Sequence, residues 1–274
     1  EAAPRSQEPT RNGQEAARAQ AILGLSVCTE LNRTMSFRLS IAAAACLTLS
    51  ISAARAAQCP PVLAGSKRLV LVTAADMNRE RVKLRLFVRD GRTARWRAVG
   101  KPRAALIGRK GMGWGHTFRQ HARRGEPVKR EGDKRTPAGF FRLGASFGFQ
   151  ASSRPGHVVL KTDETICVDD VRSKAYNTIK PRSVLGPGVR GENMRKISMY
   201  RHGLFVDYPS SRRARAGSCI FLHLMTKTGR GTLGCLAMPE MTLLGVQTFA
   251  EPGAVLGVLP ESAFKRFAGC LPAR

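Results

Sequence analysis

A histidine and a cysteine in the last quarter of the sequence have the types and spacing needed for nucleophilic catalysis. His223 and Cys235 lie twelve positions apart, with an apolar run before the histidine and glycines between the two. A free thiol is only a few per cent ionised at neutral pH, and an adjacent imidazole that accepts its proton makes it reactive toward carbonyl carbon. We therefore interpret Cys235 as a nucleophile and His223 as its general base. The same pair is also typical of a buried thiol and a structural histidine, an alternative that spacing alone leaves open.

Two local elements would position this pair. The apolar segment 220–222 predicts a buried strand that fixes the imidazole, and the glycines at 229 and 231 would turn the chain back toward it. Gly234 has no side chain, so a substrate carbonyl can approach the backbone there. Backbone N–H groups around Leu233, Gly234 and Cys235 would then stabilise an oxyanion.

Further stretches of the sequence accompany the pair. After His223 and a spacer comes Thr232-Leu233-Gly234-Cys235. Four upstream segments belong to the same pattern: Gly108–Gly111, Lys129–Gly139, Cys167–Asp170 and Tyr176-Asn177. Together these stretches resemble the L,D-transpeptidase catalytic domain of the YkuD type, whose motif is a histidine, a spacer and Ser/Thr-His-Gly-Cys. The resemblance extends over most of residues 66–260.

The resemblance implies a fold, a reaction and a substrate. The fold would be an L,D-transpeptidase-like β-sandwich with one principal helix after the catalytic cysteine. Cys235 would attack the carbonyl at the L-centre of a diaminopimelate, the third residue of a peptidoglycan stem peptide, and release the terminal D-alanine. An amine of a second stem or of an envelope protein would complete transpeptidation, and water would give L,D-carboxypeptidase activity. No metal and no organic cofactor is implied.

Two positions depart from the family's motif. Leu233 stands where the common motif has a histidine, and Ala237 stands where many members have an arginine. We expect substrate contacts instead from Thr232 and from Trp114, which lies in a glycine-rich stretch. Three arginines before the active-site strand are further candidates: Arg212, Arg213 and Arg215. The departures leave open a second function, a catalytically inactive, basic protein that binds the cell wall or another polyanion on the same fold.

The charge of the chain indicates an anionic partner or surface. Lys and Arg number 46 against 19 Asp and Glu, for a formal net charge of +27. Nucleic acid, anionic lipid and the acidic polymers of a bacterial envelope all fit such a charge. A secreted nucleic-acid binder is a third class of function. Because aromatic residues make up only 6% of the chain and form no stripe among the basic residues, we expect no nucleic-acid partner.

The first part of the sequence predicts an exported protein. Residues 1–34 are polar at the start and lack a convincing element, and we interpret them as a disordered upstream extension. Residues 35–56 have the order of a signal peptide, with a short basic region, an apolar stretch and the small residues of a cleavage site. A short buried helix is the alternative. The catalytic domain would then be residues 57–274, in the periplasm or cell envelope and without a stable membrane span.

Five cysteines follow the predicted cleavage site: Cys59, Cys167, Cys219, Cys235 and Cys270. In an oxidising compartment this odd number fits two disulfides and one free thiol. Cys59 could pair with Cys270 and Cys167 with Cys219, although the sequence does not determine the connectivity. A Cys219–Cys235 bridge would contradict the nucleophile. The sequence has no Cys-x-x-Cys or His-x-x-x-His spacing, so we expect no structural zinc site.

Short apolar segments between turn residues predict a mainly β domain. Strands are expected at 68–73, 82–88, 96–99, 140–143, 202–208, 220–222 and 254–259. The glycine-rich segment 111–116 and the basic segment 182–196 are expected to be loops, the second over the active site, and 136–139 a tight turn. Residues 239–249 predict a helix opened by Pro and Glu.

Overall fold

The computed structural model describes residues 59–250 and 253–273 of the chain. The predicted upstream extension, 1–34, and the predicted signal peptide, 35–56, lie outside the described residues. The strands are β1 (Arg68–Ala74), β2 (Arg81–Val88), β3 (Arg97–Leu106), β4 (Met112–Trp114), β5 (Thr136–Gly148), β6 (Val158–Val159), β7 (Ile166–Cys167), β8 (Ile179–Lys180), β9 (Glu192–Asn193), β10 (His202–Asp207), β11 (Phe221–Leu224), β12 (Leu236–Met238) and β13 (Val255–Pro260). The α-helices are α1 (Pro61–Ala64) and α2 (Glu240–Phe249), and the 3-10 helices are η1 (His116–His121), η2 (Arg182–Val184), η3 (Met194–Lys196), η4 (Ser198–Arg201) and η5 (Glu261–Phe267). The predicted mainly β class is confirmed.

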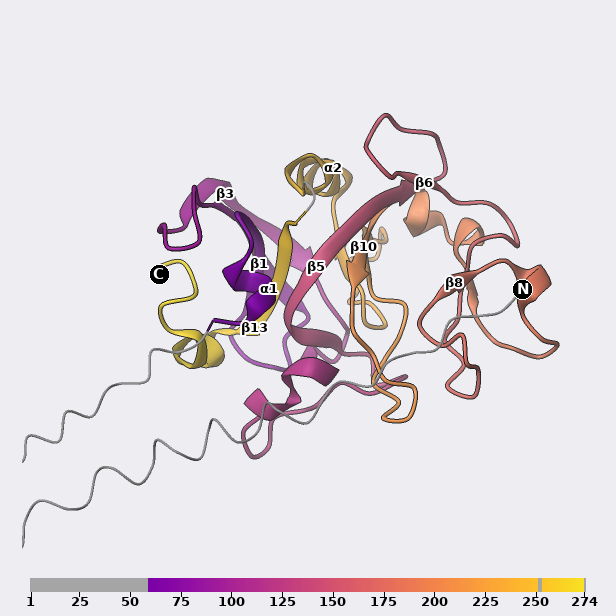
Figure 1. Ribbon diagram of the computed structural model, residues 1–274, viewed down its shortest axis with the longest axis horizontal. Helices are drawn as coiled ribbons and strands as arrows, with labels where there is room; N and C mark the ends of the chain where they lie inside the picture. Colours follow the sequence, from indigo (N-terminus) through magenta and orange to yellow (C-terminus); the bar gives the residue numbers. More distant parts are fainter. Residues whose placement is uncertain (1–58, 251–252, 274) are drawn as a thin grey trace, which may run out of the picture. The chain divides into compact units, whose positions relative to one another are not determined.

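Most strands belong to one sheet, in the order β10-β11-β12-β3-β2-β1-β13-β5-β4. Strand β5 is long enough to pair with β13 near its start and with β10 toward its end, so the pairing order returns to its first strand. Figure 1 shows β5 running from the β13 side of the domain toward β6. The sheet therefore brings β10, β11 and β12, which surround the predicted nucleophile, next to one another.

Strand β2 shows why this sequence forms half-solvated strands. Its burial alternates along Arg81–Val88, with basic side chains outward and apolar ones inward, as period-2 patterning requires. Strands β1 and β13 are instead buried almost throughout and pair in parallel, Leu69 opposite Val255. Parallel strands covered on both faces are continuously apolar, which matches the predicted segments 68–73 and 254–259.

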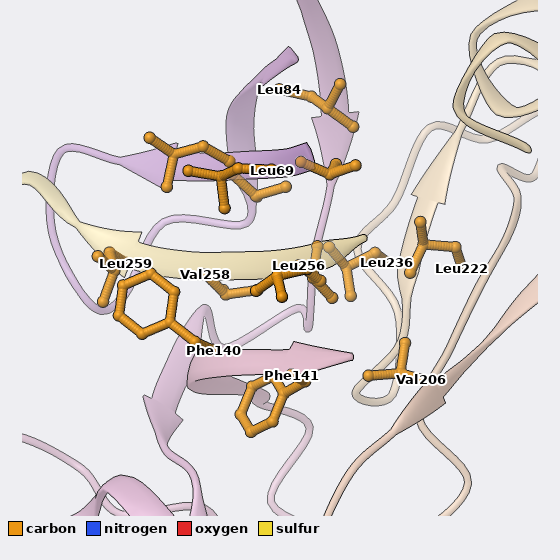
Figure 2. Packing of buried hydrophobic residues seen from close by; sticks show 14 of the residues in the cluster. Leu69, Leu84, Phe140, Phe141, Val206, Leu222, Leu236, Leu256, Val258 and Leu259 are labelled. Atoms are coloured by element: carbon orange, nitrogen blue, oxygen red, sulfur yellow. The ribbon is translucent and has the colours of Figure 1, made fainter. Parts of the chain in front are cut away.

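The main core is one apolar cluster of buried side chains from the strands of the large sheet and from α2. Phe140 and Phe141 of β5 pack with Leu256 and Val258 of β13, and each of these side chains is at most 2% exposed (Figure 2). Burial of a side chain of this size stabilises the fold by about 1.5–3 kcal/mol. The helix α2 begins after Pro239 and contributes Leu243 and Val246 to this core.

A second, smaller apolar cluster lies beside the three-stranded sheet β8-β7-β9. Its buried members are Phe147, Leu160, Cys167, Met194, Tyr200, Cys219, Phe221 and Cys235. Strands β7, β8 and β9 have two residues each, so this region has few ladder hydrogen bonds of its own. The segments that pack against Cys235 from β7, β8 and β9 must therefore be held by contacts other than strand pairing.

One segment expected to be a loop and one expected to be a turn contain strands instead. The glycine-rich segment 111–116 contains β4, which is fully buried and pairs in parallel with the start of β5. The expected turn at 136–139 is that start of β5, where Pro137 lies opposite Gly113. Both predictions were wrong because Gly and Pro are typical of turns, whereas here Gly113 lets the backbone at 128–129 approach closely and Pro137 lies at the start of β5, where a strand tolerates proline. The basic segment 182–196 contains η2, β9 and η3.

Two disulfides connect distant parts of the chain. Cys59 is bonded to Cys270, across 211 positions, and Cys167 to Cys219, across 52. Both pairings agree with the pairs considered from the sequence. Disulfides are typical of exported proteins. None of the helices within residues 59–250 and 253–273 has the length and apolar character needed to cross a bilayer.

Candidate active site

The predicted nucleophile and base line one cleft with a volume of about 700 Å³. Cys235 follows the turn before β12, and His223 lies on β11 directly opposite Ala237 in the parallel pairing. The cleft also takes in Thr232, Leu233 and Gly234 from that turn. Parallel pairing of β11 and β12 is therefore what brings the histidine and the cysteine to the same site.

Cys235 is the free cysteine of the described residues, and its thiol is buried. Its Sγ accepts a hydrogen bond from the Phe221 N–H at 3.3 Å and donates to the Cys219 carbonyl at 3.2 Å. Burial raises the pKa of the Cys235 thiol to about 12, and the charge of Glu192 adds to this rise. The thiol is therefore neutral in the resting protein and needs a base to become a nucleophile.

His223 is the neutral partner that such a thiol requires. Its ring is 4% exposed, and Nδ1 donates a hydrogen bond to the Leu224 carbonyl at 2.7 Å. Because a carbonyl oxygen can only accept, this contact places the proton on Nδ1 and leaves Nε2 as the basic nitrogen. Burial lowers the pKa of His223, while the hydrogen bond to Leu224 raises it in part. The imidazole is thus available as a base at neutral pH.

Two threonine hydroxyls hold the backbone of the turn before Cys235. Thr136 and Thr232 both donate to the Cys235 carbonyl, at 3.0 and 2.7 Å. The Gly234 N–H donates to Thr232 Oγ1 at 3.1 Å. The Gly234 N–H predicted for an oxyanion is therefore already used inside the turn, and the side chain of Thr232 shapes that turn. The Leu233 side chain is 61% exposed at the cleft.

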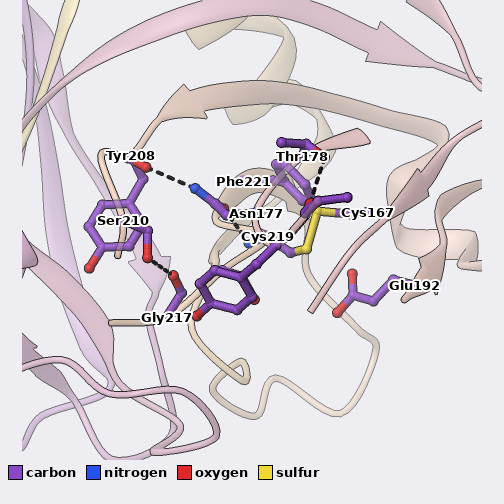
Figure 3. The surroundings of a disulfide bond; sticks show 12 residues. Cys167, Asn177, Thr178, Glu192, Tyr208, Ser210, Gly217, Cys219 and Phe221 are labelled. Atoms are coloured by element: carbon purple, nitrogen blue, oxygen red, sulfur yellow. Dashed lines mark hydrogen bonds between the residues drawn. A yellow bond between two sulfur atoms is a disulfide. The ribbon is translucent and has the colours of Figure 1, made fainter. Parts of the chain in front are cut away.

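The loop before β11 is held by the second disulfide and by one asparagine (Figure 3). Cys219 is bonded to Cys167, and its N–H donates to Asn177 Oδ1 at 3.0 Å. The amide nitrogen of the same Asn177 donates to the Tyr208 carbonyl at 3.0 Å. Cys219 and Asn177 both have positive φ, 56° and 60°, which Asn adopts more readily than most residues. These contacts fix the carbonyl that receives the Cys235 thiol hydrogen.

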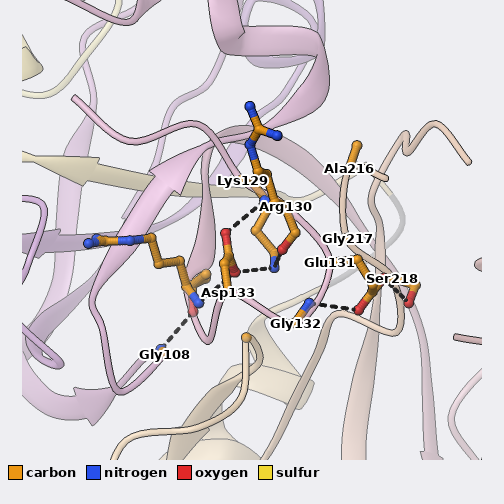
Figure 4. A network of polar contacts seen from close by, with 12 residues as sticks. Gly108, Lys129, Arg130, Glu131, Gly132, Asp133, Ala216, Gly217 and Ser218 are labelled. Atoms are coloured by element: carbon orange, nitrogen blue, oxygen red, sulfur yellow. Dashed lines mark hydrogen bonds and ion pairs between the residues drawn. The ribbon is translucent and has the colours of Figure 1, made fainter. Parts of the chain in front are cut away.

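A buried lysine and a glutamate line the cleft and contact the loop before β11 (Figure 4). Lys129 is 3% exposed and donates to Asp133 at 2.6 Å, with the Arg130 carbonyl as its second acceptor. Glu131 accepts hydrogen bonds from Tyr176 and, at 2.7 Å, from Ser218. Gly217 has a φ of 95°, and an added Cβ would lie 2.6 Å from Lys129 Cε, so both the backbone and the neighbouring side chain favour glycine there. The segment 129–139 therefore meets the active-site strand directly.

The cleft carries charged side chains of both signs. Glu131, Asp169 and Glu192 are its carboxylates, and the cations are Arg109, Lys129, Lys134 and Arg230. Burial, together with the charge of neighbouring carboxylates, raises the pKa of Asp169 and of Glu192. Among the ion pairs within the described residues, none involves these three carboxylates. The cleft therefore offers negative charge in an otherwise strongly basic protein.

Some predicted substrate contacts lie elsewhere. Trp114 is fully buried in β4, and its Nε1 donates to Glu126 at 2.8 Å, so the prediction of a substrate contact was wrong. Its indole instead packs under the Arg266 guanidinium. The three arginines before the active-site strand are exposed and do not line the cleft: Arg212, Arg213 and Arg215.

Tyr200 and Glu192 line the cleft although neither was named as a candidate from the sequence, and Glu131 joins them from the segment 129–139. Tyr200 lies on η4, and its only local signal is an aromatic residue just before β10. Among the described residues, no group of three or more His, Cys, Asp or Glu side chains is arranged to hold a metal ion.

No protein-family model matches the chain, and no curated protein matches it. The chain is similar to the solved structure of Bd1075 from Bdellovibrio bacteriovorus, at 15% sequence identity and a TM-score of 0.38. The similarity covers 78% of this chain and 56% of that one, so the chain spans little more than half the length of that structure.

Proposed function

We propose that the protein is an exported cysteine acyltransferase, an L,D-transpeptidase that acts on peptidoglycan stem peptides through an acyl-enzyme on Cys235. The observation that carries this proposal is the free thiol in a cleft shared with His223, while the other described cysteines form disulfides. The segments that carry the resemblance in sequence also contact this site, through Glu131, Asn177 and Cys167. The observed fold is mainly β. We propose that, in detail, it is the L,D-transpeptidase-like β-sandwich.

The reaction follows from a neutral thiol and a neutral imidazole. His223 Nε2 takes the thiol proton while the sulfur of Cys235 bonds to the carbonyl carbon of the diaminopimelate L-centre. The C–N bond to D-alanine then breaks, its nitrogen receives the proton from His223, and a thioester remains. An acceptor amine attacks the thioester and gives a proton to His223, which returns it to the departing sulfur. With water as acceptor, the same sequence gives L,D-carboxypeptidase activity.

The charges of the cleft support a zwitterionic substrate. A diaminopimelate side chain ends in both an ammonium and a carboxylate group, and the cleft offers carboxylates such as Asp169 together with cations such as Arg230. The basic surface of the chain, at +27, would attract the acidic wall polymer in a salt-dependent manner. An envelope protein is a second candidate acceptor, and no nucleic acid is needed as a partner.

The second candidate function is a catalytically inactive, basic protein that binds the cell wall or another polyanion on the same fold. The observations that favour it are the exposed Leu233 in place of a histidine and the use of the Gly234 N–H by Thr232. Both reduce the donors available to an oxyanion.

Intact-mass analysis after exposure to a carbapenem separates the two functions. We expect a stable adduct on the wild type and none on Cys235→Ala, since the strained β-lactam acylates a competent thiol. Absence of an adduct on both, with salt-sensitive wall binding retained in both, would favour the inactive binder. Incubation with purified muropeptides then distinguishes transfer from hydrolysis by the products formed.

A further inference from the structure

The Tyr200 ring packs against the ring of His223 and against Phe221, the residue whose N–H bonds to Cys235. Its side chain is 4% exposed, and it lines the same cleft as Cys235 and His223. Its ring meets the His223 ring edge-on, with centroids 5.3 Å apart. It also meets Phe221 edge-on at 5.6 Å, and the N–H of Phe221 is the donor to Cys235 Sγ. Tyr200 is therefore held against the two groups that the reaction uses.

The hydroxyl of Tyr200 has a defined resting partner. It donates to Glu192 Oε2 at 2.9 Å. Burial raises the pKa of Tyr200 well above its usual value, so the hydroxyl keeps its proton at neutral pH. Glu192 adds negative charge beside the thiol, which raises the pKa of Cys235, while the nearby Tyr200 hydroxyl, as a possible donor to sulfur, lowers it. The two side chains thus act on the thiol in opposite directions.

The turn before Cys235 supplies fewer donors for developing negative charge than the sequence led us to expect. The Gly234 N–H is bonded to Thr232, and Leu233 has an apolar side chain in place of the histidine of the related motif. An acyl transfer to a buried thiol needs a donor for the charge that develops on sulfur and on the carbonyl oxygen. The Tyr200 hydroxyl is a protonated donor in the cleft that can meet this need.

We propose that Tyr200 is a catalytic residue whose hydroxyl turns from Glu192 toward the negative charge that develops when Cys235 attacks the substrate. The hydroxyl keeps its proton throughout, and only the acceptor of its hydrogen bond changes. Glu192 holds the hydroxyl in the resting orientation and is a positioning residue. The proposal rests on the proposed function, because the charge arises in acyl transfer.

Two rates measured on four proteins test this role. The proteins are the wild type, Tyr200→Phe, Glu192→Gln and the control Ser146→Ala, whose hydroxyl bonds to His157 and does not line the cleft. The first rate is carbapenem acylation by intact mass. The second is iodoacetamide alkylation of Cys235 from pH 6 to 10, a readout that does not depend on the proposed function. The charged and titratable side chains that line the cleft with the thiol include Glu131, Asp169, Glu192, Lys129, Tyr200 and His223.

We expect Tyr200→Phe to slow acylation about 100-fold, the usual effect of losing one such donor, while Ser146→Ala stays close to the wild type. Alkylation should become slower in Tyr200→Phe and faster in Glu192→Gln at each pH. Wild-type acylation in Tyr200→Phe, or alkylation shifted in the same direction by both variants, would overturn the role of Tyr200. A wild type that is alkylated but never acylated would instead overturn the proposed function.

Discussion

The closed sheet and the cleft region are held together by different interactions. In the sheet, long ladders such as β1–β2 and β5–β13 surround an apolar core that includes Phe140 and Leu256. In the cleft region, strands β7, β8 and β9 have two residues each, and the shape depends on a disulfide, the side chain of Asn177 and the Lys129–Asp133 pair. The main sheet therefore places His223 and Cys235 through the pairing of β11 and β12, whereas a few directional contacts hold the loops around them.

Because of this difference, we expect substitutions in the sheet and substitutions at the cleft to affect stability and activity differently. Apolar burial is non-directional and spread over many side chains, so the sheet tolerates local change. Hydrogen bonds and ion pairs to single groups fix direction, and each loss leaves a named partner unsatisfied. Changes at the cleft should therefore displace the catalytic groups while most of the sheet remains folded.

The largest effect is expected from Asp133→Asn. Lys129 is 3% exposed, so removal of its partner leaves a buried ammonium without compensating charge, at a cost of about 3–5 kcal/mol. The matched control is Asp90→Asn, because the Asp90 pair with Arg97 is exposed on both sides and should cost about 0–1 kcal/mol. Urea unfolding measures both. Equal losses in the two variants would contradict the buried role of Lys129.

Removing one disulfide or the other should affect the two regions differently. Replacing Cys167 and Cys219 together by Ala should cost about 2–4 kcal/mol and raise amide exchange around Asn177 and β11, with loss of acylation. Replacing Cys59 and Cys270 by Ala should cost a similar amount but leave acylation intact, because that bond lies outside the cleft lining. Hydrogen exchange by mass spectrometry locates each effect. If the Cys167/Cys219 variant instead showed faster exchange evenly over the sheet, this disulfide would not act mainly on the cleft region.

A smaller effect is expected from Thr136→Val, which tests the link between the two regions. The buried hydroxyl accepts from the Gly108 N–H and donates to the Cys235 carbonyl, so its loss leaves a buried N–H unsatisfied, at about 1–3 kcal/mol. Thr248→Val, on the exposed face of α2, should change stability by less than about 0.5 kcal/mol. Thermal unfolding compares the two. Indistinguishable melting temperatures would show that Thr136 does not brace the turn.

The smallest effect is the pH dependence that His223 contributes. Burial lowers its folded-state pKa below the ordinary value near 6.5, so the unfolded chain binds the additional proton as the pH falls through that range. Stability from this group should be complete above about pH 6.5 and decline below it, by at most about 1.4 kcal/mol per pH unit. The decline should be weaker in His223→Asn, measured by urea unfolding from pH 5 to 7.5. If the free energy of unfolding of His223→Asn fell with decreasing pH as steeply as that of the wild type, the acid sensitivity would come from other groups.

Predictions from the sequence succeeded where one segment carries its own signal. The alternation at Arg81–Val88 indicates a half-solvated strand by itself, and the odd number of cysteines indicates a free thiol without reference to the fold. Gly113 and Pro137 were misleading because the same residues serve turns and close strand contacts, and only the β4–β5 pairing distinguishes the two uses. Trp114 was misplaced for the same reason.

The polar environment of the thiol could not be predicted from local patterns. Glu131, Asp169, Glu192 and Tyr200 come from separate segments, and only the packed fold brings them to one cleft. The use of the Gly234 N–H depends on the rotamer of Thr232, which no spacing determines. Residue types and spacing thus indicate the proposed reacting groups, whereas the groups that would change their pKa values are found only in the tertiary structure.

The central claim is that Cys235 forms a thioester with a stem peptide. Rapid-quench intact-mass analysis with a purified disaccharide-tetrapeptide tests it most directly. We predict a transient adduct equal to the donor minus D-alanine, located on Cys235, removed by hydroxylamine and greatly slowed in His223→Asn. A folded protein with both disulfides intact that binds the donor but never forms this adduct would contradict the claim.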